Sequence, residues 1–229
     1  NAILKNNPSR TILVPFSGGR DSSYALHFLK NKLSLNIITF TYDWGLITDL
    51  ARRNISRLCG ELGIEHILIS ADIKKKRENV NKNICAWLKN PSLGMVPLFM
   101  AGDKHFFYYA NLLRKQMKIS SILFSMNPLE RTDFKVSFCG VNELAKKEKE
   151  HYKLSFINKF RLLKYYFGQY LKSPSYFNST IFDSMKGFIS YYGLKHNYKI
   201  FYDYIEWNEK TIENILINKY GWETAPDSN

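Results

Sequence analysis

The most constraining feature of this chain is the hexapeptide Ser-Gly-Gly-Arg-Asp-Ser at residues 17–22. It follows the apolar and β-branched run Thr11–Val14 and precedes a stretch of helical character, so a strand should enter a glycine turn that opens a helix. The two glycines lack Cβ atoms, and consecutive N–H groups can therefore point into one concavity that suits phosphates. The helix behind the turn adds unpaired N–H groups, and the two serines add hydroxyl donors.

Asp21 places a carboxylate in a loop that otherwise suits anions. A bare carboxylate beside a polyphosphate is repelled, and Mg²⁺ shared between the two removes the repulsion. The pattern therefore predicts a nucleotide site with Asp21 as a ligand of Mg²⁺. The alternative is that Asp21 or Ser22 simply caps a helix after a glycine turn.

Strand and helix patterns alternate around this loop. Strands are predicted over residues 11–16, 35–41, 65–70 and 120–125, and helices over residues 22–30, 48–62, 72–88 and 97–117, with Gly63 as the stop of the second helix. Such a βαβ succession with right-handed crossovers closes as a doubly wound parallel sheet that is covered on both faces. The predicted fold class is therefore α/β.

In a doubly wound sheet, ligands bind beyond the carboxyl ends of the strands. The segments 41–45 and 126–133 follow the second and fourth predicted strands, so they should face the same crevice as the glycine loop. Asn127, Glu130 and Arg131 could converge there on Asp21, and Arg131 would suit pyrophosphate or transition-state charge. The alternative for 126–133 is a surface loop rich in turn formers.

The character of the sequence changes near residue 142, where lysine-rich and aromatic-rich helical stretches begin. Helices are predicted over residues 143–171, 180–192 and 211–220, the last one ending at Gly221. We therefore expect a nucleotide-binding α/β domain over residues 1–141. Residues 142–229 are expected to form a mainly helical extension that covers the site or binds a partner.

The formal net charge of +13 should attract polyanions such as nucleotides, nucleotide sugars, RNA or anionic lipid headgroups, although a lysine-rich composition alone would also give it. The three cysteines show no disulfide or metal-ligand spacing, and no apolar run of about 18 residues could span a bilayer. A reducing cytoplasm is the expected location. Because the sequence starts at Asn1 without Met, we expect it to be part of a longer polypeptide.

The unbroken Ser17–Ser22 motif after a first strand resembles the signature of the PP-loop ATP pyrophosphatases. The resemblance implies a Rossmann-like sheet of the HUP type and an AMP-forming enzyme that splits ATP and joins AMP to a substrate oxygen. It implies that Ser17, Gly18, Gly19, Arg20, Asp21 and Ser22 bind the phosphates with Mg²⁺. The backbone of Phe40, Thr41 and Tyr42 would meet the adenine, and Asp43 could contact ribose, metal or substrate, or cap the next helix.

Within that superfamily, the chain most resembles N-acetyl sugar amidotransferases of surface-polysaccharide pathways and asparagine-synthase-like ATPase domains. The resemblance covers residues 11–141 and is carried by the segments 17–24 and 43–50 and by Asn127 with Glu130. It implies a ligase that forms an amide or amidine on a sugar or nucleotide sugar, with Ser17, Asp21, Glu130 and Arg131 as catalytic residues. The chain shows no glutaminase of its own, so a separate subunit would supply ammonia.

Two other classes remain open from the sequence. A tRNA-modifying PP-loop enzyme would account for the net charge, and the run Lys74–Arg77 would then contact RNA rather than form a solvated turn. A nucleotide-binding regulator of the universal-stress type would use the same fold without catalysis. Salt-dependent RNA binding would identify the first class, and ATP binding without pyrophosphate release would identify the second.

Overall fold

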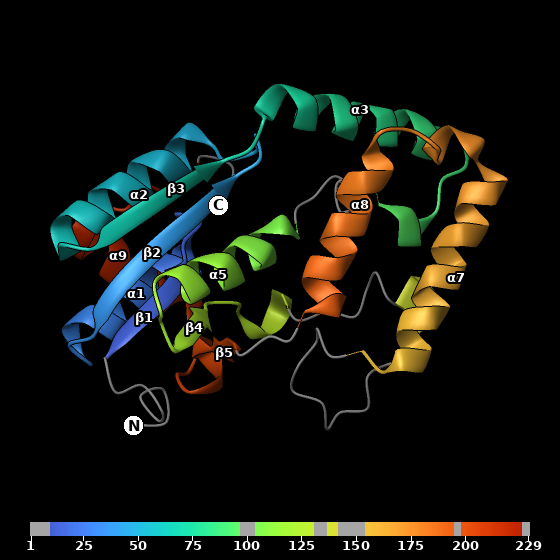
Figure 1. Ribbon diagram of the computed structural model, residues 1–229. Helices are drawn as coiled ribbons and strands as arrows, with labels where there is room; N and C mark the ends of the chain where they lie inside the picture. Colours follow the sequence, from blue (N-terminus) through green and yellow to red (C-terminus); the bar gives the residue numbers. More distant parts are fainter. Residues whose placement is uncertain (1–9, 97–103, 131–136, 142–153, 195–197, 226–229) are drawn as a thin grey trace. The chain divides into compact units, whose positions relative to one another are not determined.

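The computed structural model describes residues 10–96, 104–130, 137–141, 154–194 and 198–225 of the 229-residue chain. The chain divides into two compact units. The first unit combines Asn1–Ser70, Tyr109–Glu130 and His196–Asn229, and the second combines Ala71–Tyr108 and Arg131–Lys195. Each unit is therefore built from segments that are far apart in the sequence, as the colours of Figure 1 show.

A five-stranded parallel sheet forms the centre of the first unit. Its strands are β1 (Thr11–Pro15), β2 (Asn36–Asp43), β3 (Glu65–Ser70), β4 (Ser121–Phe124) and β5 (Tyr198–Ile200). Their order in space is β3-β2-β1-β4-β5, and the register sets Ile12 of β1 between Ile37 of β2 and Ser121 of β4. A parallel sheet that grows outward in both directions from β1 is doubly wound, which confirms the predicted fold class.

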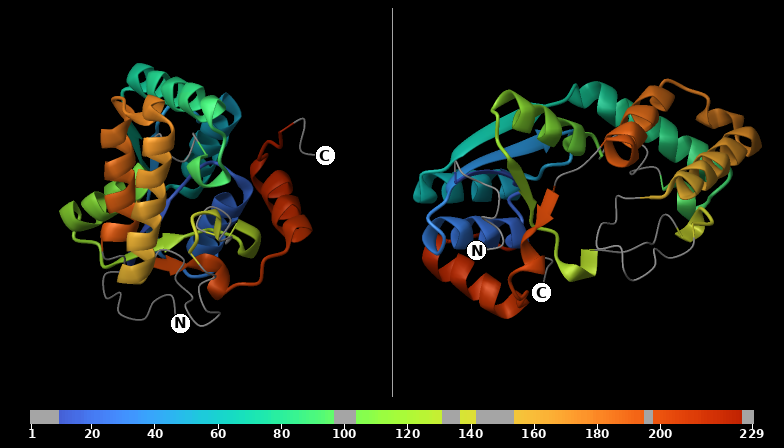
Figure 2. Two further views of the ribbon diagram at one scale, coloured as in Figure 1. Left: turned by 90° about the vertical axis from the view of Figure 1, so that its right-hand side faces the viewer. Right: turned by 60° about the horizontal axis from the view of Figure 1, so that its bottom comes forward.

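Helices cover both faces of this sheet (Figures 1 and 2). On one face, α1 (Arg20–Asn31), α2 (Asp49–Leu62) and α9 (Glu209–Tyr220) contact one another. Leu26, Leu58 and Leu216 of these helices share a core with alternate residues of the strands, such as Ile12, Val14 and Ile37. The part of α5 (His105–Gln116) from Tyr109 onward lies on the other face, where the rings of Tyr42 and Tyr109 have centroids 4.9 Å apart. The central strands are therefore buried on both sides.

Sequence signals fix the ends of α2 and α9. The Thr48 hydroxyl accepts a hydrogen bond from an N–H of the first turn of α2, and the Asn208 side chain does the same for α9. Gly63 and Gly221 end these helices in the left-handed region, with φ of +58° and +59°. The predicted stops at both glycines are confirmed.

The second unit is mainly helical among its described residues. It contains α3 (Ile73–Lys89), α7 (Phe156–Lys172) and α8 (Thr180–Phe188), a π-helical turn at Ile189–Gly193, and 3₁₀ turns at Leu93–Met95 and Pro174–Tyr176. One apolar cluster joins Ala86, Met95 and Tyr176, and another joins Cys139, Val141, Leu154 and Leu162. A largely buried ion pair of 2.7 Å between Lys76 and Asp183 links α3 to α8.

The structure departs from the sequence predictions at three places. The strand β5 was not predicted, because three residues are too few to show a period of two. The helices predicted from residues 97 and 143 begin at His105 and Phe156 in the described part, and residues 97–103 and 142–153 lie outside it. The two units are not the consecutive ranges 1–141 and 142–229, because β5 and α9 return to the sheet. No helix in the described ranges is long and apolar enough to cross a membrane.

Candidate nucleotide site

The carboxyl ends of β1 and β4 lie next to each other where the strand order reverses. The connection after β1 leads through α1 to β2 on one side of β1, whereas β4 lies on its other side, next to β5. Diverging connections at such a switch point leave a crevice at the carboxyl edge. The glycine loop at residues 16–19 follows β1, and the segment 125–130, ending in the 3₁₀ turn Pro128–Glu130, follows β4. The predicted convergence of these two segments is observed within the first unit.

The glycine loop depends on Gly18. Its φ of +77° is a conformation that side chains rarely adopt, and a Cβ added there would meet the backbone oxygen of Ala51 at 2.4 Å. A Cβ on Gly19 would meet the Ser17 Oγ at 3.2 Å. The backbone N–H of Gly19 donates to this Oγ at 3.3 Å, and the Ser17 and Ser22 hydroxyls lie 3.2 Å apart. The loop therefore packs against α2 and gathers two hydroxyls at the start of α1.

The N-terminus of α1 has no side-chain cap. Its N-cap residue is Gly19, whereas α2 and α9 of the same unit are capped by Thr48 and Asn208. The first-turn N–H groups of a helix have no partner within the helix, and they carry the positive end of the helix dipole. An uncapped helix start at the switch point can therefore bind an anion through backbone N–H groups.

Asp21 is held by donors from three parts of the first unit. Its Oδ2 accepts from Asn127 Nδ2 at 2.6 Å, and its Oδ1 accepts from Trp207 Nε1 at 2.9 Å and from Arg20 Nε at 3.3 Å. The Tyr202 hydroxyl donates to the backbone oxygen of Asp21 at 3.1 Å. A carboxylate offers about four lone-pair positions, so three donors fix its orientation and leave one position for a further ligand.

Asn127 connects Asp21 to the loop after β4. While its Nδ2 donates to Asp21, its Oδ1 accepts from the backbone N–H groups of Leu129 at 2.8 Å and Glu130 at 3.0 Å. Removal of surrounding water, and then the negative charge of Asp21, raise the pKa of the Glu130 carboxyl. Asp21, Asn127 and Glu130 thus form one electrostatically linked group, and Arg131 lies outside the described residues.

Arg20 has a structural partner that the sequence did not indicate. Its guanidinium forms ion pairs with Glu209 and, at 3.0 Å, with Glu213, both on α9. Burial lowers the pKa of Arg20, but hydrogen bonds to Glu213 and Glu209 outweigh that effect and hold the pKa above its usual value. The guanidinium carbon also lies 5.5 Å from the ring centroid of Trp207. The side chain of Arg20 therefore ties α1 to α9, while its backbone N–H belongs to the uncapped first turn.

The end of β2 presents a backbone edge to the crevice. β1 ends at Pro15, opposite Phe40, whereas β2 continues to Asp43, where β3 is its partner among the described strands. Phe40 is fully buried, and its backbone oxygen accepts from the Phe16 N–H at 2.9 Å. The Thr41 hydroxyl donates to the Phe16 carbonyl oxygen. The side chains of Phe40 and Thr41 are thus engaged within the protein, and the contact of the backbone from Phe40 to Tyr42 with adenine stays a prediction.

Asp43 is buried and already has two partners. Its carboxylate accepts from the backbone N–H of Gly45 at 2.9 Å and forms an ion pair with Arg52 of α2. The alternative that Asp43 caps the next helix is wrong, because Thr48 caps α2. A contact of Asp43 with ribose, metal or substrate stays a prediction.

Asp21 and Glu130 are the described residues that we consider as ligands of Mg²⁺. Across the described ranges, no group of three or more His, Cys, Asp or Glu side chains could hold a metal ion. Mg²⁺ favours octahedral oxygen coordination and often takes only one or two carboxylates from the protein, with phosphate and water as its other ligands. Asp21, with one lone-pair position left, and the nearby carboxyl of Glu130 fit such a shared ion, and they do not fit a metal held by protein alone.

Local sequence patterns contain no signal for three aromatic residues at this site. Tyr202 and Trp207 hold Asp21, and Trp222 Nε1 donates to the backbone oxygen of Gly18 at 3.2 Å. Trp207 lies 186 residues from Asp21 in the chain, so no local pattern could associate the two. Burial, and then the charge of Asp21, raise the pKa of Tyr202, which keeps this hydroxyl protonated as a donor.

A doubly wound parallel sheet with a glycine turn and an uncapped helix at its switch point defines a Rossmann-like α/β protein. No protein-family model matches the sequence, and no curated protein matches it.

Solved structures with a similar course of the chain include three proteins. NH3-dependent NAD synthetase from Campylobacter jejuni, in complex with the nitrate ion, is 14% identical, with a TM-score of 0.41 over 85% of this chain and 91% of that chain. NMN synthetase from Francisella tularensis is 16% identical, with a TM-score of 0.40 over 96% and 80%. A predicted subunit of tRNA methyltransferase from Methanocaldococcus jannaschii is 17% identical, with a TM-score of 0.37 over 90% and 73%. Because these sequence identities and TM-scores are low, an argument about function has to rest on the residues of the site itself.

Proposed function

We propose that this protein is an ATP-dependent adenylating enzyme of the PP-loop type, which converts ATP to AMP and pyrophosphate while it activates a carbonyl or carboxyl oxygen of an acceptor. The observation that carries the proposal is the meeting of Asp21 and Asn127, which joins the glycine loop after β1 to the loop after β4 at the switch point. Phosphates and an acceptor can be held side by side at that place.

The residues have separate roles in this proposal. The uncapped N-terminus of α1 and the hydroxyls of Ser17 and Ser22 bind the phosphates, with Gly18 and Gly19 keeping the backbone accessible. Asp21 would hold Mg²⁺, which supplies charge neutralisation at the phosphates when bound. Because these groups orient and neutralise charge, catalysis here is positioning and electrostatic stabilisation, with no covalent intermediate on the protein.

The base of the nucleotide is proposed to meet the backbone of β2 from Phe40 to Tyr42. Beyond Phe40, β2 extends past its register with β1, and among the described strands it is paired there with β3. We propose that a heterocycle bound beside this end of the strand exchanges hydrogen bonds with its backbone. Asp43 and Arg20 are engaged elsewhere through their side chains, and Glu130, with Arg131, is proposed to act at the reacting phosphate.

The acceptor class is the finer part of the proposal. We propose an amide or carboxyl group on a sugar or nucleotide sugar, as in the amidotransferases of surface-polysaccharide synthesis that the motifs resemble, with ammonia supplied by a separate glutaminase subunit. A polyanionic acceptor agrees with the net charge of +13.

A tRNA acceptor is the second candidate, and one observation favours it. A cavity of about 370 Å³ in the second unit is lined by Lys74, Lys75 and Lys82 together with Asp72, Glu78, Asn79 and Ser179. Lysines around a hollow attract phosphate groups, and RNA would be bound there in a strongly salt-dependent way.

The test is release of pyrophosphate from ATP and Mg²⁺ by the full chain, with amide-bearing nucleotide sugars plus ammonia, and bulk tRNA, supplied in turn. Asp21→Asn is the test variant, and Asp49→Asn is the matched control because Asp49 lies exposed in the first turn of the neighbouring helix α2. We expect acceptor-dependent release that Asp21→Asn abolishes and Asp49→Asn retains.

Each other outcome has a definite meaning. Release that depends on tRNA alone would assign the RNA-modifying class. Tight ATP binding without release, in the presence of ammonia and every acceptor, would assign a nucleotide-binding regulator. If ATP does not bind at all, the proposal is wrong.

A further inference from the structure

Helix α7 of the second unit is apolar on both of its sides. Its inner side carries Leu162, which is fully buried, together with Tyr165, Tyr166 and Tyr170, which pack on the two clusters of that unit. A helix of the surface normally has one apolar side and one polar side. The apolar character of the outer side of α7 therefore needs a separate explanation.

The outer side of α7 carries a stripe of large apolar side chains. We call this set the α7 stripe, and its members are Phe156, Ile157, Phe160, Leu163, Phe167 and Leu171. Their spacing of three or four residues places them on one side of the helix. Phe156 is 84% exposed, Phe160 62% and Phe167 63%. Single exposed apolar residues are ordinary, but six of them along one side of a 17-residue helix indicate an interaction surface.

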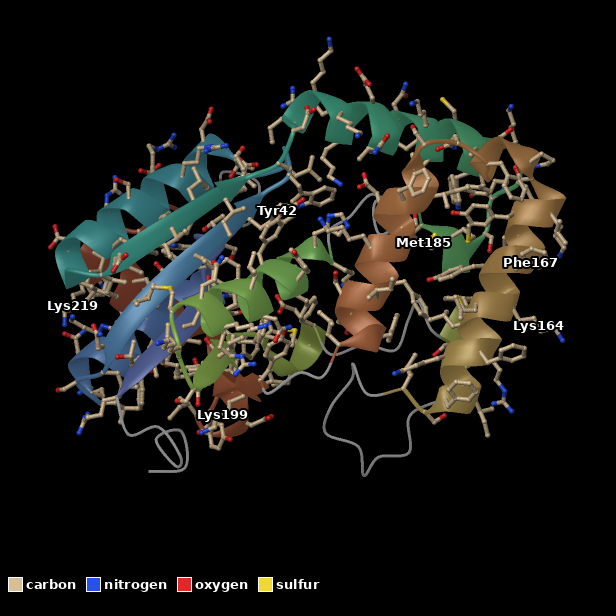
Figure 3. All side chains as sticks on the ribbon, in the orientation of Figure 1. Tyr42, Lys164, Phe167, Met185, Lys199 and Lys219 are labelled. Atoms are coloured by element: carbon tan, nitrogen blue, oxygen red, sulfur yellow. The ribbon has the colours of Figure 1, made fainter. Side chains whose placement is uncertain are left out.

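The charges beside the α7 stripe have one sign only. Lys159 borders it on one side, and Arg161 and Lys172 lie along the other side. Lys164 lies within the stripe, four residues after Phe160 and three before Phe167. The helix contains no Asp or Glu. In Figure 3 the side chain of Lys164 extends outward from α7. Protein–protein interfaces are depleted in lysine, whereas helices that lie in a membrane surface combine Phe and Leu on one side with Lys and Arg along the border.

We propose that the α7 stripe binds the surface of an anionic lipid bilayer, with α7 lying parallel to the membrane plane. The phenylalanines enter the boundary between headgroups and acyl chains, and Lys159, Arg161 and Lys164 contact the lipid phosphates. This is peripheral binding, and it agrees with the absence of a membrane-spanning helix among the described residues. The proposal stands on α7 alone and does not depend on the nucleotide site.

The test is flotation of the full chain with vesicles. Vesicles of phosphatidylglycerol and phosphatidylcholine in equal parts are compared with vesicles of phosphatidylcholine alone, at low salt and at about 0.5 M salt. We expect binding to the anionic vesicles only, and weaker binding at high salt because the lysines and the arginine contribute through charge.

Two variants and one control distinguish binding through the α7 stripe from non-specific binding of the chain to vesicles. Phe160→Ser with Phe167→Ser should weaken partitioning by about tenfold or more, since each ring loses its apolar contact with lipid. Lys164→Gln should weaken it by about fivefold at low salt and less at high salt. Leu88→Ser is the control, because Leu88 is an equally exposed apolar residue of the same unit on α3, and it should leave binding unchanged. All the substituted side chains are exposed, so the melting temperature should stay within a few degrees of the parent's.

Three results would overturn the proposal. One is that the parent chain does not float with anionic vesicles. Another is that the double phenylalanine variant binds as well as the Leu88→Ser control. The third is that the parent is a dimer by light scattering and the double variant is a monomer, which would show that a second copy of the chain covers the stripe.

Discussion

Asn127 offers the sharpest test of how the nucleotide site is built. Replacing it by alanine removes a 2.6 Å hydrogen bond to the carboxylate of Asp21 and two bonds from the backbone N–H groups of Leu129 and Glu130. A hydrogen bond to a charged group contributes about 1.5–3 kcal/mol, and a neutral one about 0.5–1.5 kcal/mol. Leu129 and Glu130 are exposed, so water can replace much of the two neutral bonds. We therefore expect a loss of about 2–3 kcal/mol in the free energy of unfolding, most of it from the bond to Asp21.

The assay pairs urea unfolding with ATP titration, and Asn54→Ala is the matched control. Asn54 is similarly buried, and its two bonds of 2.9 Å join the backbone of Glu223 and do not involve Asp21. Both alanine variants should lose stability. Only Asn127→Ala should also lose ATP affinity, by about tenfold or more, because Asp21 is no longer oriented at the phosphates.

A second substitution at the same position tests the electrostatic part. Asn127→Asp keeps an acceptor for the two backbone N–H groups but sets a carboxyl against Asp21. Two carboxyls at hydrogen-bond distance cannot both ionise without a large cost, so the introduced group should have a raised pKa. We expect Asn127→Asp to be nearer the parent in stability at about pH 5 than at about pH 8. The reasoning is refuted if Asn127→Ala and Asn54→Ala have the same effect on ATP binding, or if Asn127→Asp shows no such pH dependence.

Three further predictions follow from the same geometry. Gly18→Ala should cost at least about 1–2 kcal/mol in the free energy of unfolding, measured in urea, because a φ of +77° disfavours a side chain and the new Cβ would meet the backbone of Ala51; an unchanged midpoint would show that the loop relaxes freely. The raised pKa of Glu130 means that it loses its charge at a higher pH than an ordinary Glu, so affinity for Mg²⁺–ATP should fall as the pH drops towards about 5. Glu130→Gln should make that fall smaller and leave the part that comes from protonation of ATP itself. Burial, with the charges of Lys219 and Lys32, lowers the pKa of His27, so the free energy of unfolding should fall as the pH drops below about 6.5. His27→Gln should make that fall smaller without abolishing it, because burial also lowers the pKa of His66 and of His105; a parent profile that is already flat would contradict the prediction.

Much of the fold could be predicted from local sequence, because periodicity and helix-end signals are local. The strand at Glu65–Ser70 was predicted with its bounds, and Gly63 and Gly221 end α2 and α9 as expected. The strand β5 escaped prediction because a three-residue strand has no readable period. It is recognised only through its pairing with β4, a contact between residues more than 70 positions apart.

The candidate site divides in the same way. The glycine loop, Asp21 and Asn127 could be inferred, since each follows a strand and the carboxyl ends of parallel strands share one edge. The partners of the charged side chains could not be inferred from the sequence. Arg20 pairs with Glu213 of α9, and Asp43 pairs with Arg52. A charged residue in a motif shows which chemistry it can perform, but its counter-ion is selected by tertiary packing. Arg131 stays a prediction, because it lies outside the described residues.

Trp207 and Trp222 contact the glycine loop and Asp21 from far along the chain, so the site can be completed only late in the synthesis of this region. Asp21 is made before Trp207, which follows 186 residues later, and Trp222 is made later still. At about 5–20 residues per second, the glycine loop spends about 10–40 s without the indole that orients its carboxylate. A nascent chain therefore carries the complete motif long before it carries a complete site. Any product that stops short of residue 207 would retain the motif but lack the support that α9 and its flanking tryptophans provide.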